Sequence, residues 1–167
     1  METKKSASVV CLFIGLVLLV VTGTVDAADK ELQNENIAVK FEREVERGGY
    51  KVITTQELKG WLDQQKGMLI VDTMPADNFR KQHIPGAVNF EIQRHPELTE
   101  MSDKMKTDFE KLLGPDKNRT IVFYCGFTDC ERSHNAGMWA IKLGYKNVYR
   151  QPGGITGWLE AGYPVEK

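Results

Sequence analysis

Two neighbouring cysteines, Cys125 and Cys130, are the side chains best suited to covalent chemistry in this sequence. Cys125 directly follows a short apolar run, residues 121–124, and Arg132 stands seven positions later. Such a run is typical of a buried strand that ends in a polar loop, and the helix expected after the loop brings a partial positive charge to it. A positive field favours the thiolate, which is the nucleophilic form of cysteine. The sequence therefore predicts a reactive thiolate at Cys125.

Cys130 follows Cys125 by five positions in the same loop. A loop is able to fold back and bring two α-carbons within the roughly 4.4 to 6.8 Å that a disulfide requires. Cys130 is then either a resolving cysteine, which attacks a persulfide or sulfenate on Cys125, or a small residue that only fills the loop. Both interpretations remain open from the sequence alone.

Three other polar side chains are candidates for a supporting role. Asp72 ends the apolar run 68–72, and we expect it to accept hydrogen bonds from the cysteine loop and hold it. His83 is expected to fix a tight turn by hydrogen bonding, and His134 to lie on the solvated surface. The chain has three histidines, and because none forms a helical ligand pair, no metal site is predicted.

The segments around these residues alternate between strand and helix patterns. Thr54 to Glu57 has the form of a capping box, so a helix is expected from about Thr55. The alternation predicts an α/β fold: a central, mainly parallel sheet with helices on both faces, and a site beyond the carboxyl ends of its strands. Strands are expected at 51–53, 68–72, 88–90, 121–124 and 147–149, and further helices at 29–47, 75–82, 96–113, 133–143 and around Trp158.

The N-terminal residues have the layout of a secretory signal peptide. Lys4 and Lys5 precede the apolar run 9–21, and Ala27 is a small residue suited to cleavage. We expect residues 1–27 to be a signal peptide, 28–49 a helical extension and 50–167 the main domain, which makes the protein periplasmic or secreted. An uncleaved membrane anchor is the alternative. The net charge of −1 favours neither nucleic acid nor an anionic membrane as a partner.

Four motifs, in this order and at compatible spacing, resemble a rhodanese-like domain over roughly residues 50–165. The resemblance implies that Cys125 takes sulfane sulfur from a small donor, holds it as a persulfide and passes it to a thiol or another thiophilic acceptor. It implies no metal or organic cofactor. The motifs are Asp72; His83-Ile84-Pro85-Gly86-Ala87; Tyr124-Cys125 with Arg132-Ser133; and Gly153-Gly154-Ile155 with Trp158. The substrate-binding loop would consist of Gly126, Phe127, Thr128, Asp129, Cys130, Glu131 and Arg132.

The sequence departs from the family pattern at the loop itself. Six residues separate Cys125 from Arg132, where the usual single-domain pattern has four. Asp129 and Glu131 make the loop acidic, and Met74 stands where many relatives carry an arginine. Like charges raise the cost of bringing an anion to a site, so thiosulfate is expected to be a poor donor.

We infer three hypotheses for the function. The first is an exported sulfurtransferase that carries persulfide sulfur on Cys125. The second is a thiol–disulfide redox or sensing domain that uses the Cys125/Cys130 pair without sulfur transfer. The third is a noncatalytic rhodanese-like module that binds a protein partner.

Overall fold

The computed structural model describes residues 23–167. The charged and apolar parts of the predicted signal peptide, up to residue 21, lie outside the described residues, so export stays a prediction. Contacts group the chain into a short N-terminal unit that ends at Asn34 and a larger unit, Glu35–Lys167. Helix α1 (Gly23–Gly48) continues across that boundary. No helix within residues 23–167 has the length and apolar character needed to cross a membrane.

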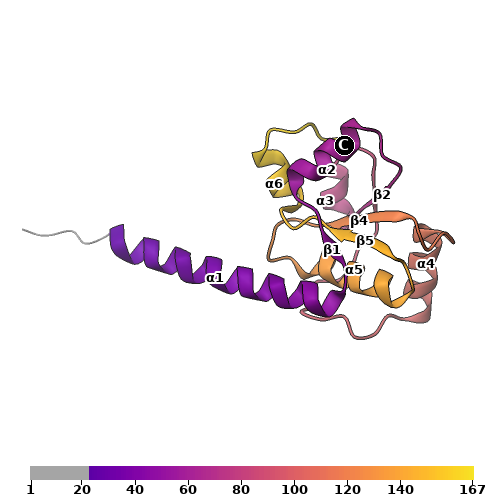
Figure 1. Cartoon of the computed structure of the whole chain (residues 1–167), viewed down its shortest axis with the longest axis horizontal. Coiled ribbons are helices and arrows are strands. Elements are labelled where there is room, and N and C mark those ends of the chain that lie inside the picture. Colours follow the sequence, from indigo (N-terminus) through magenta and orange to yellow (C-terminus); the bar gives the residue numbers. More distant parts are fainter. Residues whose placement is uncertain (1–22) are drawn as a thin grey trace, which may run out of the picture. The chain divides into compact units, whose positions relative to one another are not determined.

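The larger unit is built on five parallel strands in the order β1-β5-β4-β2-β3 (Figure 1). The two central strands, β2 and β4, consist mostly of buried apolar residues, as expected for strands covered on both faces. The predicted α/β fold with a parallel sheet is therefore confirmed. The strands are β1 (Lys51–Val52), β2 (Leu69–Asp72), β3 (Ala87–Asn89), β4 (Thr120–Tyr124) and β5 (Asn147–Arg150).

Helices cover both faces of this sheet (Figure 1). One core cluster contains Phe109 of α4 and Ala136 of α5, and the second contains Leu58 of α2 and Trp158 of α6. The sheet lies between the two cores, and the second core also includes Cys125 and Cys130, which follow the carboxyl end of β4. The helices are α2 (Thr55–Asp63), α3 (Ala76–Lys81), α4 (Asp103–Leu113), α5 (Glu131–Lys142) and α6 (Gly154–Glu160).

The starts of α2 and α4 have different causes. The Thr54 hydroxyl accepts a hydrogen bond from the Glu57 N–H, and the Glu57 carboxylate accepts one from the Thr54 N–H, so the predicted capping box is confirmed. The helix predicted from residue 96 instead begins at Asp103. Residues before it form a loop, because the backbone N–H and C=O of Leu98 bond to side chains of α5 and not to a helix.

Candidate active site at the end of strand β4

Cys125 directly follows β4, and Cys130 is the N-cap of α5. The two are joined by a disulfide, with their α-carbons 6.5 Å apart. Both side chains are buried, with exposed fractions of 1% and 2%. The structure thus brings together the two residues that the sequence singled out, in their oxidised form. A Cys125 thiolate exists only after this bond is reduced.

The first turn of α6 donates two backbone hydrogen bonds to the cysteine loop. The Ile155 N–H donates to the Cys125 carbonyl at 2.8 Å, and the Thr156 N–H donates to the Gly126 carbonyl at 3.0 Å. Gly154 has a φ of +61°, and a Cβ at this position would lie 2.4 Å from the Cys125 carbonyl oxygen. Only glycine fits this approach, which explains the Gly-Gly motif.

The loop between the cysteines has its carbonyl groups engaged and most of its amides free. The carbonyls of Cys125, Gly126, Phe127, Thr128 and Cys130 all accept hydrogen bonds. Of the amides from Gly126 to Cys130, only that of Cys130 donates to another group in the described part of the chain. Since N–H and C=O point in opposite directions in a trans peptide, fixing the carbonyls leaves amides available to an anionic sulfur. One oxygen departs from this pattern: the Cys130 carbonyl lies 3.6 Å from Cys125 Sγ.

A pocket of about 340 Å³ opens beside the loop. Phe127, which is 47% exposed, is one of the residues that line this pocket. Cys130 contributes to the wall, and Cys125 is not among the lining residues. The lining residues are Met74, Pro75, Asn78, Gly126, Phe127, Cys130, Arg132, Ile155 and Thr156.

The two acidic side chains of the loop are neutralised. Lys40 of α1 lies 2.5 Å from the Asp129 carboxylate and 2.7 Å from that of Glu131, and Arg94 lies 3.1 Å from Glu131. Burial alone would raise the pKa of Glu131, but hydrogen bonds from Lys40 and Arg94 hold it at about 2. The expected acidic field at the loop is therefore wrong, because cations outside the motif balance it.

Arg132 contributes a positive charge to the pocket. Its Nε donates to the Ile92 carbonyl at 2.9 Å, and its Nη1 lies 4.0 Å from Cys130 Sγ. The backbone contact fixes the guanidinium beside the sulfur of Cys130, a residue that lines the pocket. This location suits a group that orients an anionic sulfur compound.

Sequence reasoning missed a buried arginine that binds two backbone carbonyls of the loop. Arg150, at the end of β5, is completely buried and donates to the carbonyls of Thr128 and Cys130 at 3.0 and 3.1 Å. Its charge is balanced by Glu44 of α1 at 2.5 Å. One feature of the sequence could have indicated Arg150: it directly follows the predicted strand 147–149, and a strand next to β4 would bring it close to the cysteine loop. On helix α1, Glu44 is buried, whereas Phe41 is only half-buried.

Asp72 and His83 each contact a nearby backbone group. The expectation that Asp72 accepts hydrogen bonds from the cysteine loop is wrong: within residues 23–167 its carboxylate accepts the Met74 N–H at 2.8 Å, and no residue of the loop donates to it. Burial raises the pKa of Asp72. His83 contacts the Phe79 carbonyl through Nδ1 at 2.9 Å and stacks on the Phe79 ring, consistent with fixing a turn.

His134 was expected on the surface, and this expectation is wrong. Its side chain is fully buried, and Nδ1 lies 2.9 Å from the Tyr50 hydroxyl. Nε2 has no hydrogen-bond partner within residues 23–167. Burial, together with the positive charges of Arg150, Arg47 and Lys40, lowers the pKa of His134 from 6.5 to about 4.

This lowered pKa predicts an acid-sensitive fold. Between pH 6.5 and 4 the unfolded chain binds a proton on His134 and the folded protein does not, so the free energy of unfolding falls as pH drops, by up to about 3 kcal/mol. Urea unfolding of the wild type and His134→Gln at several pH values in this window checks it. Asp72 titrates in both proteins and cancels in the comparison. Equal pH slopes for the two proteins would contradict the assignment.

Within residues 23–167 there is no cluster of three or more histidine, cysteine, aspartate or glutamate side chains that could bind a metal ion. The chemistry available at the site is that of the two sulfur atoms, the loop amides and Arg132.

Two curated proteins are similar to this chain in sequence. The thiosulfate sulfurtransferase GlpE of Haemophilus influenzae is 27% identical over 117 residues, which cover 70% of this chain and 95% of that protein. The tRNA uridine(34) hydroxylase of Burkholderia ambifaria is 28% identical over 121 residues, but these cover only 39% of that protein.

Solved structures show the same fold. A thiosulfate sulfurtransferase from Pseudomonas aeruginosa superposes with a TM-score of 0.59 at 21% identity, covering 78% of this chain and 22% of that one. The polysulfide-sulfur transferase of Wolinella succinogenes gives 0.57 at 16% identity, covering 80% and 88%. The family model described as a rhodanese-like domain matches residues 54–161. The chain therefore belongs to the rhodanese-like domain family, which includes sulfurtransferases.

Proposed function

We propose that this protein is an exported sulfurtransferase that carries sulfane sulfur as a persulfide on Cys125. The observation that carries the proposal is the loop itself: it follows β4 directly, five of its carbonyls accept hydrogen bonds, and four of its amides are free in the described part of the chain. Amides aimed at a bound anion stabilise it as an oxyanion hole does. Membership of a family that includes thiosulfate sulfurtransferases supports the same reaction.

The reaction has two steps on Cys125. In the first, the Cys125 thiolate attacks the outer sulfur of the donor; the donor's S–S bond breaks, and the remainder leaves with the electron pair, as sulfite from thiosulfate or as a thiolate from an organic persulfide. In the second, a nucleophilic acceptor attacks the outer sulfur of the Cys125 persulfide. The acceptor keeps that sulfur, and the Cys125 thiolate is regenerated.

Cys130 provides a second outcome for the persulfide. Its thiolate attacks Cys125 Sγ, the persulfide bond breaks and hydrosulfide leaves. The product is the Cys125–Cys130 disulfide, the oxidised form seen in this structure. Two external thiols restore the reduced protein and leave as their own disulfide.

Arg132 is expected to govern the use of anionic donors. Because it lies at the pocket beside Cys130 Sγ, Arg132→Met removes the positive charge that an anionic donor meets. We expect KM for thiosulfate to rise about tenfold or more, the effect of losing one charged hydrogen bond, with little change for an uncharged organic trisulfide. Steady-state kinetics with both donors measure it, with Lys104→Met as a control for loss of an exposed cation. An equal change with both donors would count against this role.

The transfer itself is tested with the reduced wild-type protein. Thiosulfate or an organic persulfide is supplied as donor and cyanide as acceptor, and thiocyanate is measured. Turnover with either donor supports the proposal. The complete lack of thiocyanate with both, from protein whose thiols are shown to be reduced, would refute it.

The disulfide favours a second candidate function. A thiol–disulfide redox or sensing domain would use the Cys125/Cys130 pair without sulfur transfer, and the pocket offers Cys130 to an incoming thiolate. This function requires a reversible two-electron couple that disappears in Cys130→Ser. The redox function would be eliminated if the wild-type protein had no such couple and if Cys130→Ser transferred sulfur as the wild type does.

We also propose that the protein acts outside the cytoplasm. Lys4, Lys5, the apolar run 9–21 and Ala27 support export, and a disulfide persists most readily in an oxidising compartment. The N-terminal sequence of the protein isolated from its cells tests this location. A start at Ala28 is expected, and an intact Met1 would contradict cleavage.

A further inference from the structure

Arg150 links the cysteine loop to three other parts of the fold. All five of its N–H donors are engaged. Nη2 donates to the Thr128 and Cys130 carbonyls, Nε to Ser133 Oγ at 3.1 Å, and Nη1 to Glu44 and, at 3.2 Å, to the Tyr50 hydroxyl. A guanidinium with every donor used and no exposed surface has one orientation available.

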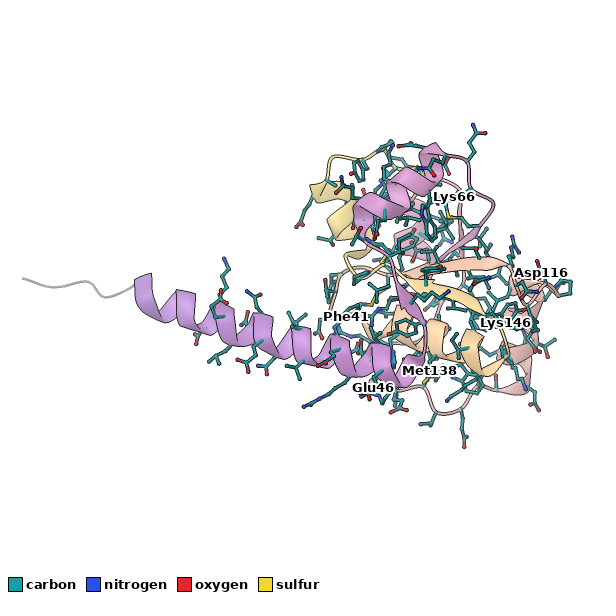
Figure 2. The ribbon with its side chains drawn as sticks, viewed as in Figure 1. Phe41, Glu46, Lys66, Asp116, Met138 and Lys146 are labelled. Carbon is teal, nitrogen blue, oxygen red and sulfur yellow. A yellow bond between two sulfur atoms is a disulfide. The ribbon has the colours of Figure 1, made fainter. Side chains whose placement is uncertain are left out.

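The opposite side of this arrangement comes from α1, upstream of the matched family domain at 54–161. Glu44, which is 2% exposed, supplies the counter-charge for Arg150. The ring of Phe41, labelled in Figure 2, lies 5.0 Å from the Arg150 guanidinium carbon. One turn away, Lys40 binds Asp129 and Glu131 of the same loop. Residues 40–44 therefore hold the loop both directly and through Arg150.

The contacts of Arg150 affect the distance between the two cysteines. The α-carbons of Cys125 and Cys130 are 6.5 Å apart, near the upper end of the range of about 4.4 to 6.8 Å in which a disulfide forms. Cys125 is fixed by β4 and by Ile155, so the separation depends on the position of Cys130. Arg150 binds the Cys130 carbonyl itself. A small outward movement of that residue would take the pair out of range.

We propose that Arg150, held by Glu44, is a positioning residue that keeps Cys130 within bonding distance of Cys125 and so favours the oxidised state of the pair. The inference rests on the proposed redox chemistry of the two cysteines. In the redox equilibrium the protein disulfide reacts with two molecules of glutathione. The products are the protein with two free thiols and one molecule of glutathione disulfide. One S–S bond breaks and one forms, and the two protons of the glutathione thiols pass to Cys125 and Cys130.

The test is a titration of the purified full chain in glutathione redox buffers, with protein thiols counted by alkylation and mass spectrometry. Arg150→Lys keeps the charge but loses the forked contact to two carbonyls. Glu44→Gln with Arg150→Met removes both buried charges together, so neither is left unpaired. Arg119→Lys is the matched control, since Arg119 also donates to a backbone carbonyl, that of Leu113, away from the loop.

We expect disulfide formation to become about tenfold less favourable in Arg150→Lys, the effect of losing one charged hydrogen bond, and at least as unfavourable in the double variant. Tenfold corresponds to about 30 mV for a two-electron couple. Arg119→Lys should match the wild type. Circular dichroism confirms that each variant compared is folded, and the titration is read from those that are.

Two results would overturn the inference, and they are distinguishable. A wild-type protein that shows no reversible couple in these buffers would remove the redox chemistry and the positioning role together. A wild type with a normal couple, and an Arg150→Lys protein with the same equilibrium constant, would remove the role of Arg150 alone. A shift of equal size in Arg119→Lys would also overturn it, since the effect would then not come from the loop.

Discussion

Cys125→Ser will fail to take up sulfur from a persulfide donor, whereas Cys130→Ser will take it up and retain it. A serine hydroxyl is not ionised near neutral pH and forms no persulfide, so we expect activity to fall by roughly a thousandfold or more, to the background reaction. Cys130 lies at the N-cap of α5 and lines the pocket, but it is not the residue that β4 and the Gly154 turn hold in place.

The two serine variants are controls for each other, since each removes one sulfur atom and the disulfide. Persulfide should accumulate in Cys130→Ser, because the thiolate that resolves it to the disulfide is absent. Thiocyanate formation and mass spectrometry of the reduced variants measure both effects. Equal activity of Cys125→Ser and the wild type would show that the nucleophile had been assigned to the wrong cysteine.

Gly154→Ala will destabilise the fold and displace the loop. The added Cβ would lie 2.4 Å from the Cys125 carbonyl oxygen and 2.5 Å from the Gly126 carbonyl carbon, and φ is +61°. Both neighbours are backbone atoms, which move only with the loop. We expect the free energy of unfolding to fall by roughly 2 to 4 kcal/mol, from backbone strain and the steric conflict, and sulfur transfer to fall with it.

Gly157→Ala provides the matched control in the same helix. Its Cβ would meet only the Thr55 hydroxyl, at 3.4 Å, and alanine is a better helix former than glycine. Thermal and urea denaturation compare the two variants with the wild type. A Gly154→Ala protein as stable as Gly157→Ala, with normal activity, would show that the close approach under Cys125 is not required.

The sequence was sufficient for the parts of the fold that depend on local pattern. The apolar runs before Asp72 and Cys125 predicted the two central strands, and the Thr54 capping box predicted the start of α2. Gly153-Gly154 belongs to one of the four motifs recognised in the sequence, and Gly154 has a positive φ. Each of these features is determined by neighbours in the chain, which a single sequence displays.

Features that depend on distant pairs were not predicted. Arg150 and Glu44 are 106 positions apart, and His134 and Tyr50 are 84 apart, so nothing beside either residue indicates its partner. The surface assignment of His134 was therefore wrong, and Arg150 was missed. The acidic loop misled for the same reason, since its balancing cation, Lys40, lies 89 positions from Asp129.

The segment from Pro96 to Ser102 shows how tertiary contacts override a local pattern. Its polar composition continues that of α4, yet Asn135 and Trp139 of α5 bind the backbone of Leu98. Those side chains satisfy polar groups that a helix would otherwise satisfy internally. The observed helix begins only after this anchored loop.

The most direct measurement of the central claim is intact-mass analysis of the reduced wild-type protein after a brief exposure to an organic persulfide, followed by peptide mapping. The proposed function predicts the added mass of one sulfur atom, located on the peptide that contains Cys125 and removable by cyanide. Reduced protein that gains no sulfur, or that gains it on Cys130 with Cys125 left free, would contradict it.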